Sequence, residues 1–277
     1  MVPFSALARD SEEPTRGPAG STGRAYRRFP PYARRWNAPP LPRHRRRPAI
    51  EPAVPPSRPA PPRPAADLLA DSALSGWLAE WQPEEAAIAA ARQRAAEVGV
   101  AAVDPVTGAV LRTLAALVRA RSVVEVGTGA GVSTLWLLRG MVADGIVTSV
   151  DAEGEHQRLA RLSLAEAGVA PARARLIAGR ALEVLPRLSD GAYDLMFCDA
   201  ARSENVDYLA AALRLLRVGG LVVFAGALSG GRVALPSARD ADTVAARELA
   251  KTVKEEDRLA PVILPVGAGL LVAVHVG

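Results

Sequence analysis

A glycine-rich turn near the middle of the sequence has the residue types and spacing that best suit ligand binding. An apolar run over residues 122–126 leads into Gly127-Thr128-Gly129-Ala130-Gly131, and an amphipathic run follows. Without side chains at the three glycines, the backbone can turn sharply and approach a ligand closely. Free N–H groups at the start of the following helix favour a carboxylate or a phosphate. The segment predicts a cofactor site, although a tight strand-to-helix turn without a ligand has the same features.

An acidic residue ends the second apolar run and strengthens this prediction. Asp151 lies twenty residues after Gly131, where its carboxylate can accept hydrogen bonds from both hydroxyls of a ribose. A role as helix N-cap is the alternative, and it is compatible with ribose binding. A dinucleotide fingerprint requires a further glycine at position 132, where this chain has Val132. The pattern therefore favours a nucleoside cofactor other than NAD.

Alternating apolar and amphipathic runs predict the elements that position these residues. Two helices come first, one starting near Pro83 and closed by Gly99, the other starting at Asp104. Strands are expected over residues 122–126, 146–150, 175–177, 193–198, 221–224, 260–265 and 269–276. Helices are expected over residues 132–141, 153–167, 181–188, 205–216 and 240–255.

This order predicts an α/β fold, a doubly wound, Rossmann-like sheet of seven strands with helices on both faces. The link of about three residues between the last two strands is too short for a parallel crossover. The last strand is therefore expected to run antiparallel, which a plain dinucleotide-binding sheet does not show.

The glycine turn with Glu125 in the preceding strand resembles the first motif of class I methyltransferases. The segments EVGTGAGVSTLWLL, TSVDAE, GRALEVLP, YDLMFCDA and LRLLRVGGLVV, in this order, resemble the catechol and caffeoyl-CoA O-methyltransferase family (O-methyltransferase family 3), particularly its bacterial branch. The resemblance covers residues 67–276. It implies S-adenosylmethionine as cofactor and a small-molecule hydroxyl as acceptor.

The resemblance also implies the site residues. Carried over by position, the cofactor site comprises Val103, Glu125, Gly127, Thr128, Gly129, Ser133, Asp151, Ala152, Ala181 and Asp199. Residues 179–181 are expected beside the adenine. Glu125 is expected near the ammonium group of the cofactor, although a buried carboxylate there can instead bind loop amides. The family habit of pairing through the amino-terminal helices implies a homodimer.

The chain departs from the family at the metal site. Typical members have D-A-D-K after the fourth strand and D-N after the fifth, whereas this chain has Asp199-Ala200-Ala201-Arg202 and Ala225-Gly226. One carboxylate is a poor donor set for Mg²⁺, so no divalent metal is expected. The guanidinium of Arg202 stays protonated and cannot act as a base, although it can hold an anionic substrate. Asp199 is a candidate catalytic base, and a carboxylate that orients cofactor or loop is the equal alternative.

Composition divides the chain into two parts. Residues 1–66 form an Arg/Pro-rich tail that we expect to be disordered, and residues 67–277 form the methyltransferase domain. Thirteen arginines face four acidic residues in the first 65 positions, so the remaining residues carry a net charge of −4 within the chain's +5. The basic charge thus belongs to the tail and predicts no nucleic-acid binding by the domain, although residues 43–47 can contact an anionic surface.

A single cysteine, Cys198, fits a reducing cytoplasm, and no apolar run is long enough to span a membrane. Three other functions stay open: an NAD-dependent reductase, a non-catalytic binder of S-adenosylmethionine or S-adenosylhomocysteine, and a nucleic-acid methyltransferase. Trp77, Trp81 and Trp136 are predicted in the core, and Tyr208 is predicted to pack on a helix face. Residues 228–237 are expected to border the acceptor pocket.

Overall fold

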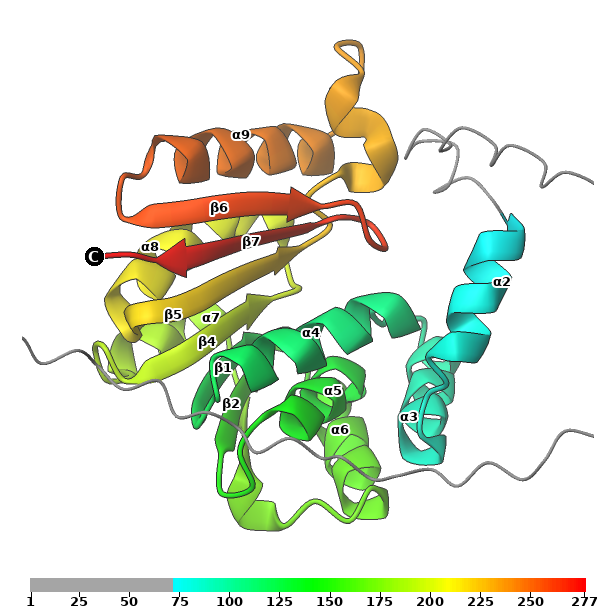
Figure 1. The fold of residues 1–277 in the computed structure, drawn as a ribbon. Coiled ribbons are helices and arrows are strands. Elements are labelled where there is room, and N and C mark those ends of the chain that lie inside the picture. Colours follow the sequence, from blue (N-terminus) through cyan, green and yellow to red (C-terminus); the bar gives the residue numbers. More distant parts are fainter. Residues whose placement is uncertain (1–71) are drawn as a thin grey trace, which may run out of the picture. The chain divides into compact units, whose positions relative to one another are not determined.

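The computed structural model describes residues 72–277 (Figure 1). The predicted tail and the first five residues of the predicted domain lie outside this part. The helices are α2 (Ser72–Trp81), α3 (Ala86–Glu97), α4 (Pro105–Leu117), α5 (Val132–Gly140), α6 (Gly154–Glu166), α7 (Ala181–Val184), α8 (Asn205–Leu215) and α9 (Ala241–Glu255). The strands are β1 (Ser122–Val126), β2 (Ile146–Asp151), β3 (Ala174–Ala178), β4 (Tyr193–Cys198), β5 (Leu216–Ala225), β6 (Leu259–Leu264) and β7 (Leu270–His275).

The seven strands form one sheet in the order β3-β2-β1-β4-β5-β7-β6. Strands β1 to β5 pair in parallel, and β7 runs antiparallel to both β5 and β6. The predicted doubly wound sheet with an antiparallel last strand is confirmed. Because β1 lies between β2 and β4, the carboxyl ends of these three strands meet at one edge, where such sheets bind ligands.

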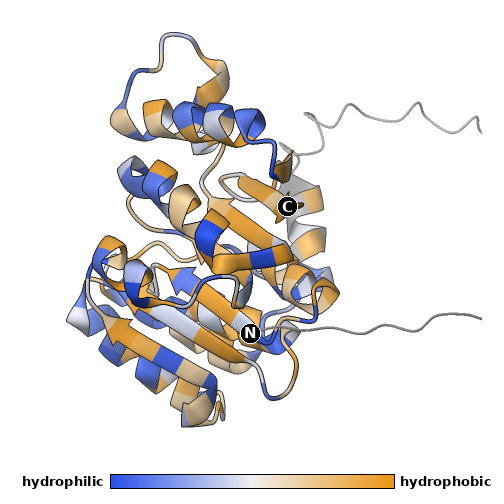
Figure 2. Ribbon diagram, turned by 90° about the vertical axis from the view of Figure 1, so that its left-hand side faces the viewer, coloured by the Kyte–Doolittle hydropathy of each residue, from blue (hydrophilic) through white to orange (hydrophobic). Residues whose placement is uncertain are grey.

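Helices cover both faces of the sheet (Figure 1). On one face, apolar side chains of α7, α8 and α9 pack against the strands, with Leu209 and Leu249 fully buried. On the other face, α3, α4 and α5 contribute Ile88, Leu111 and Leu135 to the second half of the core. Figure 2 shows the strands as largely hydrophobic, whereas the helices alternate hydrophobic and hydrophilic residues. A helix that buries one side against the sheet and exposes the other to solvent has this alternation.

Glycines bring α4 and α5 into close contact. A Cβ on Gly108 would lie 2.2 Å from Nε1 of Trp136, and a Cβ on Gly140 would lie 2.0 Å from the carbonyl oxygen of Arg112. Trp136 is therefore buried between the helices, as predicted. The same prediction is wrong for Trp77 and Trp81, which are 56% and 67% exposed and stack on each other along α2.

Two elements differ from their predicted bounds by several residues, each for a local reason. Strand β5 begins at Leu216 instead of 221, because a register shift against β4 accommodates Gly219 and Gly220 within the strand. Helix α7 ends at Val184 and continues as a 3-10 turn over Leu185–Arg187, because Pro186 has no N–H to continue the α-helical hydrogen bonds. Among residues 72–277, no helix is long and apolar enough to cross a membrane.

Candidate active site

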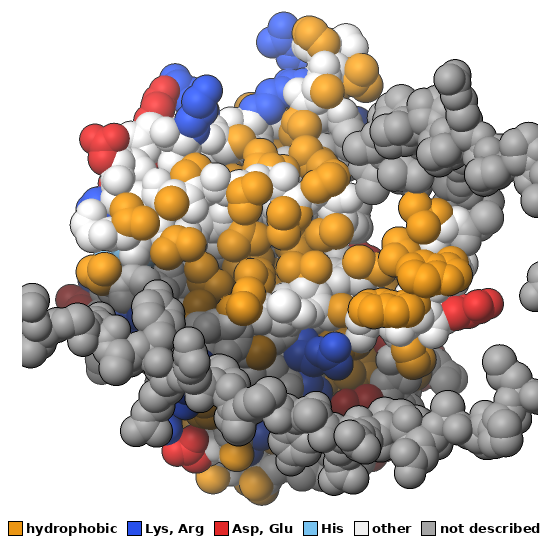
Figure 3. All heavy atoms as spheres, viewed as in Figure 1, with side chains coloured by type: hydrophobic (Ala, Val, Ile, Leu, Met, Phe, Trp, Pro, Cys, Tyr) orange, Lys and Arg blue, Asp and Glu red, His pale blue; other side chains and the backbone are white. Residues whose placement is uncertain are grey.

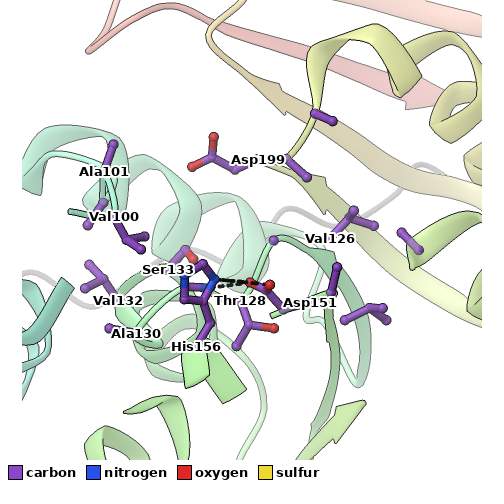
Figure 4. Close-up of a pocket in the computed structure, with 18 of the residues that line it drawn as sticks. Val100, Ala101, Val126, Thr128, Ala130, Val132, Ser133, Asp151, His156 and Asp199 are labelled. Carbon is purple, nitrogen blue, oxygen red and sulfur yellow. Dashed lines mark hydrogen bonds and ion pairs between the residues drawn. The ribbon is translucent and has the colours of Figure 1, made fainter. Parts of the chain in front are cut away.

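A cavity of about 390 Å³ opens at the carboxyl ends of β1, β2 and β4 (Figure 4). Its volume lies in the range of small-molecule and cofactor sites. Its wall contains every predicted cofactor residue except Glu125: Val103, Gly127, Thr128, Gly129, Ser133, Asp151, Ala152, Ala181 and Asp199. Residues that are far apart in the sequence thus converge on one space.

The glycine turn forms one side of this cavity. Gly127, Gly129 and Gly131 all have positive φ angles, which residues with a Cβ adopt only at a cost. A Cβ on Gly127 would lie 2.1 Å from the carbonyl oxygen of Asp199, so the turn passes directly against the chain that leaves β4. The amide of Asp199 in turn donates to the carbonyl of Val126. The glycines are therefore needed for the contact between the two loops as well as for the turn.

Asp151 ties the end of β2 to the glycine turn. Its Oδ2 accepts a hydrogen bond from the amide of Gly129 at 2.9 Å, and its Oδ1 accepts one from the amide of Glu153 at 2.9 Å. Nδ1 of His156 lies 3.2 Å from both carboxylate oxygens (Figure 4). A carboxylate has about four lone-pair positions, so Asp151 retains capacity for a ligand hydroxyl.

Glu125 lies behind the cavity wall instead of in it. Its side chain is fully buried, and its Oε2 accepts hydrogen bonds from the hydroxyls of Thr134 and Ser149, each at 2.5 Å. Within the described residues, Oε1 has no hydrogen-bond partner. Burial raises the pKa of Glu125 to about 7, against the effect of hydroxyl groups that include that of Ser133. Because Ser133 lines the cavity, it connects this carboxyl group to the site.

A second cavity of about 390 Å³ adjoins the first. Both are lined by Ala101, Ala102, Val103 and Asp199, and the second continues along β5 and the β6–β7 connection through Ala225, Gly226 and Gly267. Asp199 thus stands in the wall common to the two spaces. Its side chain faces the open cavities, yet surrounding protein raises its pKa by desolvation, and the charge of Arg202 partly offsets this effect.

Comparison with known proteins decides the family. The model of the O-methyltransferase family matches residues 84–276. The chain belongs to this family. A Mycolicibacterium vanbaalenii protein named as an O-methyltransferase is 53% identical over 190 residues, which are 69% of this chain and 84% of the relative. The family predicted from the sequence motifs is confirmed.

Solved structures agree with this O-methyltransferase assignment. The O-methyltransferase TomG of Streptomyces achromogenes, involved in tomaymycin synthesis and crystallised with S-adenosylmethionine, has a TM-score of 0.68 at 29% identity, covering 74% of this chain and 96% of its own. A Bacillus cereus O-methyltransferase in complex with S-adenosylhomocysteine has a TM-score of 0.68 at 27% identity, covering 73% and 97%. These two neighbours bind S-adenosylmethionine or its product, so the predicted S-adenosylmethionine-dependent class is confirmed.

The donor atoms of this O-methyltransferase do not fit the divalent cation that the resemblance implies. Asp199 is the only donor side chain at the corresponding positions, because Ala201, Ala225 and Gly226 carry none. Residues 72–277 contain no cluster of three His, Cys, Asp or Glu side chains that could hold a metal. Mg²⁺ and Ca²⁺ require several oxygen ligands. At these positions the chain thus supplies one side chain with oxygen ligands, that of Asp199.

Three side chains with ionisable groups line the cavity without having been predicted there, namely His156, Glu204 and Tyr208, whereas Arg180 belongs to the segment expected beside the adenine. Tyr208 is buried, as a packing role predicts, but its hydroxyl also donates to Glu204 at 2.5 Å. Arg180 pairs with the same carboxylate at 3.0 Å. Burial, with Glu204 nearby, raises the pKa of Tyr208. His156 follows Asp151 by five residues, a spacing that brings the first turn of α6 back to the strand end.

Residues 228–237, which were expected to border the acceptor pocket, do not line either of these two cavities. Ala225 at the end of β5 and Gly226 after it line the second cavity, and the chain then enters a 3-10 turn over Ser229–Ala234. Arg247 of α9 holds this turn through hydrogen bonds to the carbonyls of Val233 and Ala238. The segment that borders the cavity is instead the β6–β7 connection, from Val266 to Gly269.

Proposed function

We propose that this O-methyltransferase transfers the methyl group of S-adenosylmethionine to a hydroxyl of a small molecule without a divalent metal. The observation that carries this proposal is the position of Asp199 in the wall common to two adjoining cavities. The first cavity takes the cofactor and the second takes the acceptor. A carboxylate between them lies where methyl transfer and proton transfer must meet.

The cofactor is held by the residues predicted for it. Asp151 accepts hydrogen bonds from the ribose hydroxyls, and the amides of the glycine turn face the carboxylate of the methionine part. Ala181, at the start of α7, borders the adenine together with Gly179. When bound, the cofactor supplies an activated methyl group on a positively charged sulfur. Glu125 acts as a positioning residue, because its carboxylate reaches the cavity through Ser133.

Asp199 serves as the base. It takes the proton of the acceptor hydroxyl while the hydroxyl oxygen bonds to the methyl carbon, and the carbon–sulfur bond breaks with its electron pair left on sulfur. The raised pKa of Asp199 makes its carboxylate a better proton acceptor than an ordinary aspartate. In-line alignment of the acceptor oxygen at about 3 Å supplies much of the rate enhancement.

Transfer of a radioactive methyl group to a panel of hydroxyl compounds, in buffer with EDTA, tests this function. We expect turnover in EDTA and a loss of kcat of about 100-fold or more in D199N. D190N is the matched control, since Asp190 is an exposed residue paired with Arg214. A D199N variant that changes only KM for the cofactor would favour the orienting role for Asp199. Cofactor binding without turnover on any acceptor would favour the non-catalytic binder.

We also propose that two copies of the chain pair. Figure 3 shows apolar side chains gathered over β5, β6 and β7 and on α2, and the exposed residues there include Trp77, Trp81 and Val262. Exposed apolar patches and edge strands favour association unless they are covered. A second copy covers both, in line with the homodimer that the resemblance implies. Sedimentation should give a dimer for the wild type and a monomer for V262K; a wild-type monomer at tens of micromolar would contradict pairing.

We place the enzyme in the cytoplasm, because its one cysteine, Cys198, is a buried free thiol.

A further inference from the structure

Among residues 72–277, Arg202 is the one cationic side chain in the wall of the second cavity. It follows β4 in a short 3-10 turn, Arg202–Glu204, and its side chain is 28% exposed. The neighbouring wall is made of alanine, glycine, valine and leucine, with Asp104, Thr107 and Asp199 as the other polar residues. A charged group in an otherwise apolar pocket fixes the orientation of a ligand.

The guanidinium is held in place from two sides. Its Nη1 donates to Oδ2 of Asp242 in α9 at 2.8 Å. Gly226 lies beside the guanidinium, where a Cβ would be 2.5 Å from Nη2, 2.6 Å from Nε and 2.8 Å from Cζ. Gly226 has a φ of +73°, which already favours glycine, and the guanidinium fills the space that any side chain there would need. Arg202 is therefore a positioned cation rather than a mobile surface residue.

Two nitrogens of this guanidinium, Nε and Nη2, have no hydrogen-bond partner in the described part of the chain. Among residues 72–277, Asp242 is the hydrogen-bond acceptor of Arg202, and it uses Nη1 alone. Nε and Nη2 form the side of the guanidinium that matches a carboxylate with two parallel hydrogen bonds. A donor pair in a partly enclosed cavity gains from an anionic partner, since unpaired polar groups are costly away from water.

The other charges around the cavity limit the charge of that partner. Asp104 is already used, because Oδ1 accepts from the amides of Val106 and Thr107 and Oδ2 accepts from the hydroxyl of Thr107. Asp199 and Asp242 add negative charge near Arg202. A doubly charged phosphate would be repelled by these groups, whereas a carboxylate carries one charge and has the planar shape that Nε and Nη2 match.

We propose that Arg202 binds the methyl acceptor, and that this acceptor is a hydroxy acid whose carboxylate is held by Nε and Nη2. This inference rests on the proposed function, because it takes the second cavity as the acceptor site. Arg202 then orients the acceptor with a fixed cation, and Asp199 faces the hydroxyl to be methylated.

Calorimetric binding to the full chain saturated with S-adenosylhomocysteine tests this inference. The probes are the three isomers of hydroxybenzoate, which vary the spacing of carboxylate and hydroxyl, each paired with its neutral hydroxybenzamide. We expect at least one acid to bind 10-fold or more tightly than its amide. R202M should remove this preference, R202K should restore part of it, and R258M, at an exposed ion pair with Glu256, should leave it unchanged.

The outcomes separate the inference from the function on which it rests. Equal affinity for acids and amides, binding of neither, or an acid preference that survives in R202M would overturn the inference. Saturation of the protein with S-adenosylhomocysteine is measured first in the same titration. Failure at that first step would contradict the proposed function instead.

Discussion

The guanidinium of Arg202 lies against the Cα of Gly226, 24 positions later in the chain and at the end of the neighbouring strand. A Cβ on Gly226 would be 2.5 Å from Nη2, so the two residues depend on each other. In the resemblance, these positions hold the lysine that serves as general base and the asparagine that binds the metal. Here an arginine fills the space of the missing asparagine side chain.

G226A is expected to displace Arg202. The new Cβ collides with the guanidinium, and the positive φ at position 226 lowers the free energy of unfolding by about 1–2 kcal/mol. Turnover of the best acceptor should fall about 10-fold or more, while affinity for S-adenosylmethionine stays within about 2-fold of the wild type. Steady-state kinetics with a cofactor titration check this. An unchanged kcat/KM for the acceptor would contradict the positioning role of Gly226.

Gly127 provides a test of the contact between the two loops. G127A places a Cβ 2.1 Å from the carbonyl oxygen of Asp199 and should lower the free energy of unfolding by about 3 kcal/mol or more. Affinity for the cofactor should fall as well. G191A is a matched control: its φ is also positive, but a Cβ there meets no atom within 4 Å, so the cost should be about 1–2 kcal/mol. Urea denaturation measures both, and equal costs would refute the loop contact.

Asp151 should dominate recognition of the ribose. D151N keeps the shape of the side chain but removes its charge, which contributes about 1.5–3 kcal/mol through hydrogen bonds. Affinity for S-adenosylmethionine should therefore drop about 10- to 100-fold. D144N, at an exposed ion pair with Arg121, should bind like the wild type. Comparable affinities of D151N and D144N would remove Asp151 from the cofactor site.

Glu125 predicts a pH dependence of stability. Its pKa of about 7 in the folded chain exceeds its ordinary value near 4.5, so the folded state holds the proton more tightly than the unfolded state. The unfolding free energy should therefore fall as pH rises from about 4.5 to 7, by about 3 kcal/mol from this group.

E125Q cannot ionise and should lose this contribution. Its unfolding free energy should differ less between pH 5 and pH 8 than that of the wild type, in urea denaturation without cofactor. The pKa of Asp199 is also raised, so Asp199 contributes a fall in unfolding free energy with rising pH in both proteins. Parallel pH profiles for E125Q and the wild type would show that Glu125 does not titrate in this range.

The sequence predicted the sheet for clear reasons, and nine of the ten residues predicted for the cofactor line the first cavity. Strands β1 and β4 have the predicted bounds, because continuous apolar runs between polar turns indicate buried strands. The glycine turn and Asp151 follow strand ends, so the topology alone brings them together.

Other features depend on packing that a linear pattern does not contain. Helical spacing placed Trp77 and Trp81 in the core, but α2 lies at the margin of the domain, where no second layer covers these rings within the described residues. His156 and Glu204 line the cavity because of how their turns face the strand ends. The contact between Arg202 and Gly226 links residues on different loops, and only the fold reveals it.

Titration of the full chain with S-adenosylmethionine, in EDTA and then with excess Mg²⁺, tests the central claim most directly. We predict micromolar affinity that is the same in both buffers and falls in D151N, together with no binding of NADH. Absence of S-adenosylmethionine binding by the folded chain would contradict the cofactor site. Binding or turnover that requires Mg²⁺ would contradict the metal-independent site.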